Sequence, residues 1–144
     1  MRTNNVITIL TTPHGQIVYF DIQEGKGDIK GMMRTMSQKW SAYLDGTFPL
    51  IVADRESWGV EHFLSLEGCR FVTWEYFCEK ERLFSIPQKA FGPVFYVNGK
   101  GYQAYEEKKE YKDGKGNRIT LRRVVIWNKE RDERVACVAQ DELE

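Results

Sequence analysis

The sequence places one carboxylate where chemistry is expected, at the end of a short apolar run. Asp54 directly follows Leu50-Ile-Val-Ala53, and four consecutive apolar residues are typical of a strand that is buried on both faces. We therefore expect Asp54 at the C-terminal edge of a central strand, where α/β sheets bind their ligands. A carboxylate buried there would need an ion pair, hydrogen bonds or a metal. The alternative interpretation is that Asp54 caps the following helix or pairs with Arg55.

A second charged group lies in the last third of the chain. Its cations are Lys115, Arg118, Arg122 and Arg123, and the acids on the preceding β-rich segment are Glu106, Glu107 and Glu110. A basic strand of this kind could contact phosphates. The acids could also neutralise it across a hairpin, and we favour this solvated ladder of salt bridges.

Other familiar sites have little support in the sequence. Gly25-Lys-Gly-Asp28 lacks the spacing of a phosphate-binding loop, so we expect a turn there. His14 lies in an expected hairpin turn and His62 on an expected helix, without the partners of a metal site. No nucleophile motif of a serine or cysteine hydrolase occurs.

The N-terminal half predicts alternating strands and helices. Residues 6–12 and 17–22 predict an antiparallel hairpin, and the apolar spacing of residues 29–44 predicts an amphipathic helix with a methionine-rich core face. After the strand at residues 50–53, Ser57 is expected to cap a short helix, and residues 69–75 form the next strand. The apolar face of this short helix is predicted to be Val60, Phe63 and Leu64. The resulting order is β-β-α-β-α-β.

The C-terminal half predicts an antiparallel meander. Turn residues Asn98-Gly99 and Asp113-Gly-Lys-Gly-Asn117 separate its β-rich segments. The expected strands are residues 94–97, 102–105, 106–111, 118–127 and 134–139.

Composition limits the class of protein. The 144 residues carry 21 basic and 21 acidic side chains, so charge alone does not announce nucleic-acid binding. The three cysteines, Cys69, Cys78 and Cys137, are widely spaced and are expected to be free thiols. No segment resembles a signal peptide or a membrane span. We therefore expect a soluble cytoplasmic protein of one domain size.

Several segments together resemble a known family. Ala53-Asp-Arg-Glu56 is followed by a strand in Gly68-Cys-Arg-Phe-Val-Thr-Trp74, and Gly15-Gln-Ile-Val-Tyr19 is followed by Glu24-Gly-Lys-Gly-Asp28. These segments resemble motifs of insertion-sequence transposases of the DDE superfamily, over residues 6–140. The resemblance implies an RNase H-like mixed sheet without its first strand in residues 1–76, and a β-meander insertion in residues 77–144.

The resemblance also implies a chemistry. In this family, two aspartates and a glutamate hold two divalent cations, normally Mg²⁺, for in-line attack on a phosphodiester. Only Asp54 carries over, as a catalytic residue and metal ligand. Asn4 and Asn5 supply no first acid, and the Y-x-x-R-x-x-E pattern of the final glutamate does not occur. Arg55 and Glu56 match the second motif, and Arg55 is expected to contact DNA or form a salt bridge.

The sequence thus predicts a fragment or decayed copy of a transposase catalytic domain, which acts in DNA transposition and recombination. DNA is the expected partner of the full-length protein, and a homodimer is allowed. Mg²⁺ binding is expected to be weak or absent here, and the chain alone should not cleave DNA. The alternative is a non-catalytic module that presents Arg118, Arg122 and Arg123 to DNA or to an acidic partner. An unrelated small nuclease would need a second carboxylate motif.

Overall fold

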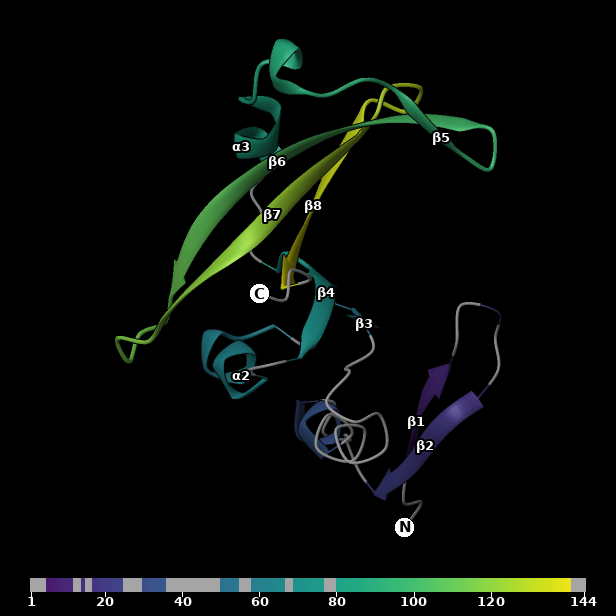
Figure 1. Cartoon of the computed structure of the whole chain (residues 1–144), viewed down its shortest axis with the longest axis vertical. Helices are drawn as coiled ribbons and strands as arrows, with labels where there is room; N and C mark the ends of the chain where they lie inside the picture. The colour runs from purple at the N-terminus through teal and green to yellow at the C-terminus, as the bar shows by residue number, and fades with distance from the viewer. Residues whose placement is uncertain are drawn as a thin grey trace. The chain divides into compact units, whose positions relative to one another are not determined.

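The chain contains two compact units, Met1–Gly46 and Thr47–Glu144, which are described separately. The computed structural model describes residues 5–11, 14, 17–24, 30–35, 50–54, 58–66, 69–76 and 80–140 (Figure 1).

The first unit contains a β-hairpin and a helical segment. Strands β1 (Asn5–Thr11) and β2 (Ile17–Glu24) pair antiparallel, which confirms the predicted hairpin. Residues 30–35 are helical, and Met32 and Met33 are buried, as the methionine-rich core face predicts. The rest of the helix predicted to residue 44, and the loop at residues 25–29, lie outside the described residues.

The second unit is built on a six-stranded mixed sheet. Its strands are β3 (Leu50–Ala53), β4 (Arg70–Trp74), β5 (Phe95–Val97), β6 (Lys100–Lys112), β7 (Arg118–Asn128) and β8 (Glu133–Gln140). Their order across the sheet is β3-β4-β8-β7-β6-β5. Strands β3 and β4 are parallel, and every other neighbouring pair is antiparallel. The helices are α2 (Val60–Ser65), α3 (Lys80–Phe84) and the 3-10 helix η2 (Gln88–Ala90). The fold is therefore of the mixed α/β class.

Strand β3 lies at the edge of this sheet, with β4 as its neighbour among the described strands. Its Ile51 is 6% exposed, whereas Val52 is 73% exposed. The prediction of a central strand buried on both faces is therefore wrong. An apolar run identifies a strand, but it does not reveal how many neighbours the strand has.

Helix α2 connects β3 to β4 and covers one face of the sheet. The helix begins at Val60 after its N-cap residue Gly59, which provides no side-chain cap, and the predicted cap Ser57 lies outside the described residues. Val60 and Phe63 are buried as predicted, and the Phe63 ring stacks on Phe71 of β4 with a centroid distance of 4.9 Å. The prediction that Leu64 belongs to the apolar face of this helix is wrong. Leu64 is 41% exposed and His62 is buried in its place, because the side of the helix toward the sheet includes residue 62.

The C-terminal meander follows the predicted turns. Strand β5 pairs with the start of β6, and β7 and β8 continue the antiparallel order. The segments expected at residues 102–105 and 106–111 are one continuous strand, β6, which belongs to both hairpins. Strand β8 also pairs with β4, and this joins the meander to the parallel pair in one sheet. For this reason the chain does not divide between residues 76 and 77, where the sequence placed a boundary.

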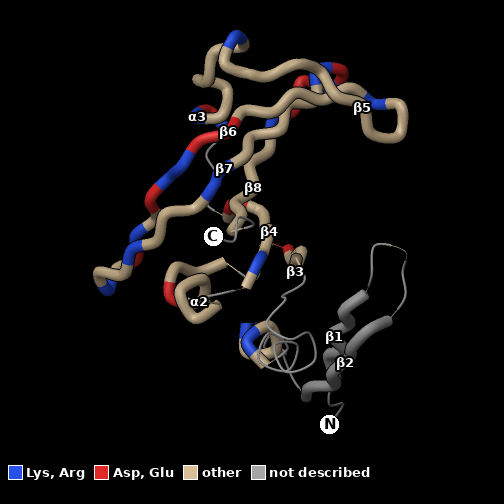
Figure 2. Tube along the Cα trace, viewed as in Figure 1, with Lys and Arg blue, Asp and Glu red and all other residues tan. Residues whose placement is uncertain are grey.

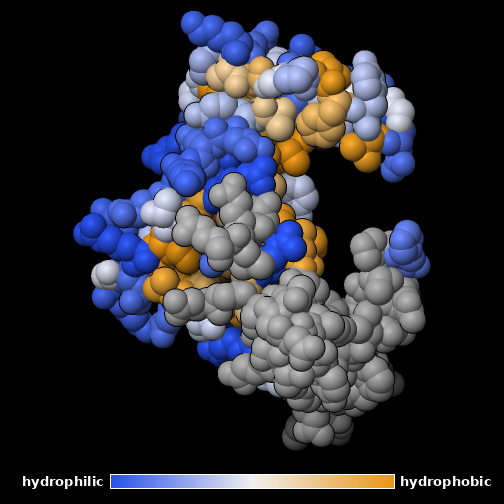
Figure 3. Space-filling model, viewed as in Figure 1, coloured by the Kyte–Doolittle hydropathy of each residue, from blue (hydrophilic) through white to orange (hydrophobic). Residues whose placement is uncertain are grey.

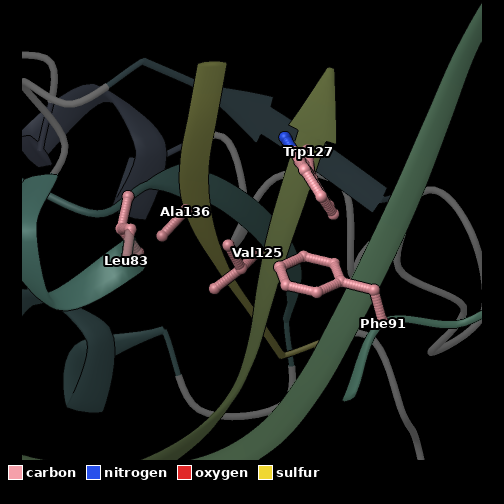
Figure 4. Packing of buried hydrophobic residues seen from close by; sticks show 5 residues of the cluster. All are labelled: Leu83, Phe91, Val125, Trp127 and Ala136. Atoms are coloured by element: carbon pink, nitrogen blue, oxygen red, sulfur yellow. The ribbon is translucent and has the colours of Figure 1, made fainter. Parts of the chain in front are cut away.

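The core of the second unit lies between the sheet and the α3–η2 segment. Its buried cluster consists of Leu83, Phe91, Val125, Trp127 and Ala136 (Figure 4). Leu83 comes from α3 and Phe91 follows η2, while the other members come from β7 and β8. Because strand side chains alternate, Val125, Trp127 and Ala136 share one face of the sheet with Phe71, and we call it the helix-covered face.

The turn between β5 and β6 gives a first testable prediction. Asn98 and Gly99 have φ angles of 50° and 76°, so both adopt the left-handed conformation that favours asparagine and glycine. Gly99→Ala is expected to lower the free energy of unfolding by about 1 kcal/mol. No neighbouring atom lies within 4 Å of the position that a Cβ would take at Gly99, so the loss would report backbone strain.

Gly114 in the β6–β7 turn supplies the matched control. A Cβ at this position would also meet open space, and the φ of Gly114 is not positive. Gly114→Ala is expected to leave stability unchanged or raise it by about 0.5 kcal/mol. Urea denaturation of both variants checks the pair, and equal effects would contradict the conformational explanation.

Candidate functional site

Asp54 follows the last residue of β3, as the sequence predicts, but it is exposed. Its backbone carbonyl accepts a hydrogen bond of 2.6 Å from the hydroxyl of Thr73, which is buried in β4. This bond ties the C-terminal ends of the two parallel strands together. The expectation of a buried carboxylate is wrong because β3 is an edge strand. The catalytic and metal-binding role of Asp54 stays a prediction.

A second carboxylate lies at the same end of the sheet. Glu75 directly follows β4, whose register pairs Ala53 with Thr73. Unlike Asp54, Glu75 has a side chain only 6% exposed. Sequence analysis did not single out this residue. Alternation along the strand places Glu75 on the helix-covered face, together with Phe71 and Thr73. This alternation is the sequence pattern that could have identified Glu75.

Glu75 is bound by three side chains of the meander. Arg123 donates from Nε and Nη2 to its Oε2, at 3.0 and 2.8 Å. Tyr111 and Lys109 donate to Oε1, at 2.9 and 3.4 Å. A further hydrogen bond of 2.9 Å runs from Arg123 to Glu107. The carboxylate of Glu75 is thus committed to holding β4 against β6 and β7.

The buried network changes the pKa of two of its members. Burial, together with the hydrogen bond to Glu75, raises the pKa of Tyr111 well above its usual value. Burial alone would lower the pKa of Arg123, but its hydrogen bonds to Glu75 and Glu107 outweigh this effect and raise it. Both groups therefore keep their protons throughout the physiological range, and the network is structural.

The predicted basic strand is paired with acids. Arg122 binds Glu106, with an Nε–Oε2 distance of 3.1 Å, and this hydrogen bond lowers the pKa of Glu106. Arg118 lies 4.0 Å from Glu110. Figure 2 shows acidic and basic segments alternating along β6, with the basic residues of β7 on the neighbouring strand. This geometry favours the salt-bridge ladder at these positions.

The three arginines nevertheless differ in exposure. The side chains of Arg118 and Arg122 are 63% and 33% exposed, whereas that of Arg123 is 9% exposed. Arg123 therefore does not belong to a solvated ladder. Contact of these residues with DNA stays a prediction, and Arg55 lies outside the described residues.

Among the described residues, the donor set at this end of the sheet does not fit a two-cation centre. Such a centre needs several free carboxylates, because Mg²⁺ prefers hard oxygen ligands. Here Asp54 is exposed while Glu75 is occupied by Arg123 and Tyr111. In the part of the chain that the structure describes, no group of three histidine, cysteine or acidic residues could hold a metal ion.

The remaining candidate residues are placed as follows. His14 is exposed, and His62 is buried with its ring 5.9 Å from the ring of Phe63. Cys69 is buried and Cys137 half-buried, and both are free thiols as predicted, while Cys78 lies outside the described residues. None of the described helices is long and apolar enough to cross a membrane.

Comparison of the chain with protein-family models, with curated proteins and with solved structures finds no match.

Proposed function

We propose that this chain derives from the RNase H-like catalytic domain of a DDE-superfamily insertion-sequence transposase and carries its second aspartate, Asp54. In the full-length protein such a domain cleaves and joins DNA strands in transposition. The observation that carries the proposal is the position of Asp54 directly after the first strand of a parallel β3–α2–β4 unit. Ligand-binding residues of open α/β sheets lie at this end of parallel strands.

Two further features support the proposal. An antiparallel hairpin and a helical segment precede β3, in the order that the resemblance implies. Strand β3 is also the edge of its sheet among the described strands. The strand with the first aspartate of the family would pair with β3 on this open side.

The same geometry argues against cleavage by this chain alone. Asp54 is the one carboxylate that the proposal assigns to the metal centre, and a single carboxylate cannot position two cations. Glu75 could replace the missing ligands only by giving up its two hydrogen bonds from the buried Arg123.

We expect purified protein to show no Mg²⁺- or Mn²⁺-dependent cleavage of single- or double-stranded DNA above a protein-free control. Asp54→Asn and the exposed-acid control Glu130→Gln are expected to be equally inactive. The measurement is release of labelled fragments on a denaturing gel. Robust cleavage that Asp54→Asn abolishes and Glu130→Gln preserves would overturn the proposed inactivity.

The proposed ancestry has a separate test in the DNA on both sides of the coding sequence. We expect an upstream segment that encodes a strand with an aspartate, and a downstream segment that encodes a helix with the Y-x-x-R-x-x-E pattern. Intact unrelated genes directly on both sides, with no such remnants, would argue against descent from a transposase.

The alternative of a binding module that uses Arg118, Arg122 and Arg123 has less support. Each of these cations already lies against a glutamate of β6 or the glutamate that follows β4. Binding DNA there would require breaking those pairs.

A further inference from the structure

The far end of the six-stranded sheet exposes an uninterrupted apolar segment. Residues 94–97, which we call the β5 edge, include the whole of β5, which is the outermost of the described strands at this end. Their exposed fractions are 44% for Val94, 42% for Phe95, 75% for Tyr96 and 50% for Val97. Figure 3 shows hydrophobic side chains at this end of the molecule, and β5 itself contains no charged residue (Figure 2).

The exposed side chains of the β5 edge are held in place by the sheet beneath them. The Tyr96 ring and a methyl group of Val94 lie 3.4 and 3.2 Å from the position that a Cβ would take at Gly101, so the missing side chain of this glycine makes room for them. On the other face, the Phe95 ring lies 6.0 Å from that of Tyr102. The surface is therefore preorganised, and a partner would not have to order it.

The edge lacks charged side chains, one of the features that usually prevent strand pairing, although β5 is short and Pro93 precedes it. Edge strands are normally protected by charged side chains, bulges or a covering segment. Residues 91–97 carry no charge, and Pro93 is the one residue there that cannot donate a backbone hydrogen bond. An exposed apolar edge of this kind is suited to the addition of an extended strand from a partner.

A hollow with two cations lies on the neighbouring strands of the sheet, over β6, β7 and β8. Its volume is about 200 Å³, and its lining is Lys100, Tyr102, Ile126, Asn128, Arg131, Glu133 and Val135. Lys100 is paired in register with Val97, so the hollow adjoins the end of β5. Within the described part of the chain, neither Lys100 nor Arg131 forms an ion pair. Because Glu133 is the single acid of the lining, the two cations give the hollow a net charge of +1.

Charge and shape distinguish between the classes of partner. A nucleic acid would require a stronger positive excess, and two of the four exposed residues are valines, which provide no ring for base stacking. In a two-fold pairing of β5 with a second copy, centred on Tyr96, Phe95 of one copy would oppose Val97 of the other. Beyond this pair, the second copy would present its residues 92–94, which carry no charge. A second copy would therefore bring no acid to Lys100 and Arg131. A protein segment that carries its own acids matches both the apolar edge and the hollow.

We propose that the β5 edge binds an extended segment of a partner protein. The segment adds to β5 as a further strand, places alternating apolar side chains over Phe95 and Val97, and places acidic side chains at the hollow beside Lys100 and Arg131. This interaction does not depend on the proposed transposase ancestry.

Selection from a display library of short random linear peptides tests the proposal. The full chain is the bait, and Tyr96→Asp serves for counter-selection. We expect enrichment of peptides with alternating apolar residues and acids near one end. Their affinity, measured by fluorescence anisotropy, is expected to fall about tenfold or more in Tyr96→Asp and in the double variant Lys100→Glu/Arg131→Glu. Changing the peptide acids to lysine should restore binding to the double variant. Lys108→Glu, an exposed change elsewhere on β6, should leave the affinity unchanged.

The other outcomes overturn the proposal. They are an absence of enrichment over Tyr96→Asp, concentration-dependent self-association that Tyr96→Asp abolishes, and salt-sensitive binding of a single-stranded oligonucleotide that Lys100→Glu/Arg131→Glu abolishes. Circular dichroism and thermal unfolding confirm that each variant is folded before its binding is interpreted. Because Tyr96, Lys100 and Arg131 are exposed or line an open hollow, these variants should unfold within a few degrees of the unchanged protein.

Discussion

Arg123→Met is expected to lower the free energy of unfolding by about 3 kcal/mol, because it removes the buried ion-pair partner of Glu75 and leaves this carboxylate only the hydrogen bond from Tyr111 and the longer contact with the partly exposed Lys109. The side chain of Glu75 is 6% exposed, and Arg123 supplies two of its hydrogen bonds. Water therefore cannot replace the guanidinium without local opening of the sheet. Methionine keeps much of the volume of arginine, so the loss would report the missing charge and hydrogen bonds.

Urea denaturation measures this effect, and Arg122→Met is the matched control. Arg122 is the preceding residue of the same strand, and its pair with Glu106 is exposed to solvent. Removing that pair should cost less than about 1 kcal/mol. In the double variant Glu75→Leu/Arg123→Met, neither position carries a charge. We therefore expect the double variant to regain much of the free energy of unfolding that Arg123→Met loses. Equal losses in the two single variants would show that burial does not govern the Arg123 pair.

The meander could be predicted from sequence because its information is local. Asn98-Gly99 and residues 113–117 mark the tight turns, and each turn fixes the register of the strands on either side. The structure confirms these turns. The opposition of arginines on β7 to glutamates on β6 follows from the same register. It could therefore be predicted from the spacing of the charges around one turn.

The surroundings of Asp54 could not be predicted in the same way. The apolar run Leu50-Ile-Val-Ala53 establishes a strand, and that part of the prediction is confirmed. The number of its neighbours depends on which distant segments pair with it. Sequence pattern does not carry that information, so the exposure of Val52 and of Asp54 became visible only in the structure.

The buried ion pair was missed for a related reason. Glu75 and Arg123 are separated by 48 positions, with the whole β5–β6 hairpin between them. The sequence suggested nearer partners for Arg123, and Glu107 is indeed one of them. The pairing with Glu75 depends on β8, which lies between β4 and β7 and sets their relative register.

Arg134 provides a second large effect, through a different kind of contact. Its guanidinium carbon lies 4.4 Å from the ring centroid of Trp127, 4.7 Å from that of Phe91 and 5.0 Å from that of Phe84. The same group donates to the backbone carbonyls of Leu83 and Ile86, at 2.7 and 2.9 Å. Cation–π contacts are strongest when water is excluded, and Arg134 is 7% exposed. This one side chain therefore fastens α3 and the following turn to the sheet.

We expect Arg134→Met to lower the free energy of unfolding by about 3 kcal/mol, because two backbone carbonyls, one of them in a buried contact, lose the guanidinium donor and three rings lose the cation. The free energy of unfolding of Arg134→Lys should lie between those of Arg134→Met and the unchanged protein. An ammonium keeps the charge, but it cannot stack on the rings or reach both carbonyls equally. Lys108→Met, which removes an exposed cation from β6, should change stability by less than about 0.5 kcal/mol.

Hydrogen exchange separates this fastening role from a general loss of packing. In Arg134→Met, amides of α3 should exchange faster under native conditions by a larger factor than amides of β7 and β8, because the contact that is lost lies between α3 and the sheet. Uniform acceleration in all of these elements would mean that Arg134 contributes only to the core as a whole. Unchanged exchange in α3 would mean that the packing of Leu83 against Val125 and Ala136 is sufficient to hold the helix.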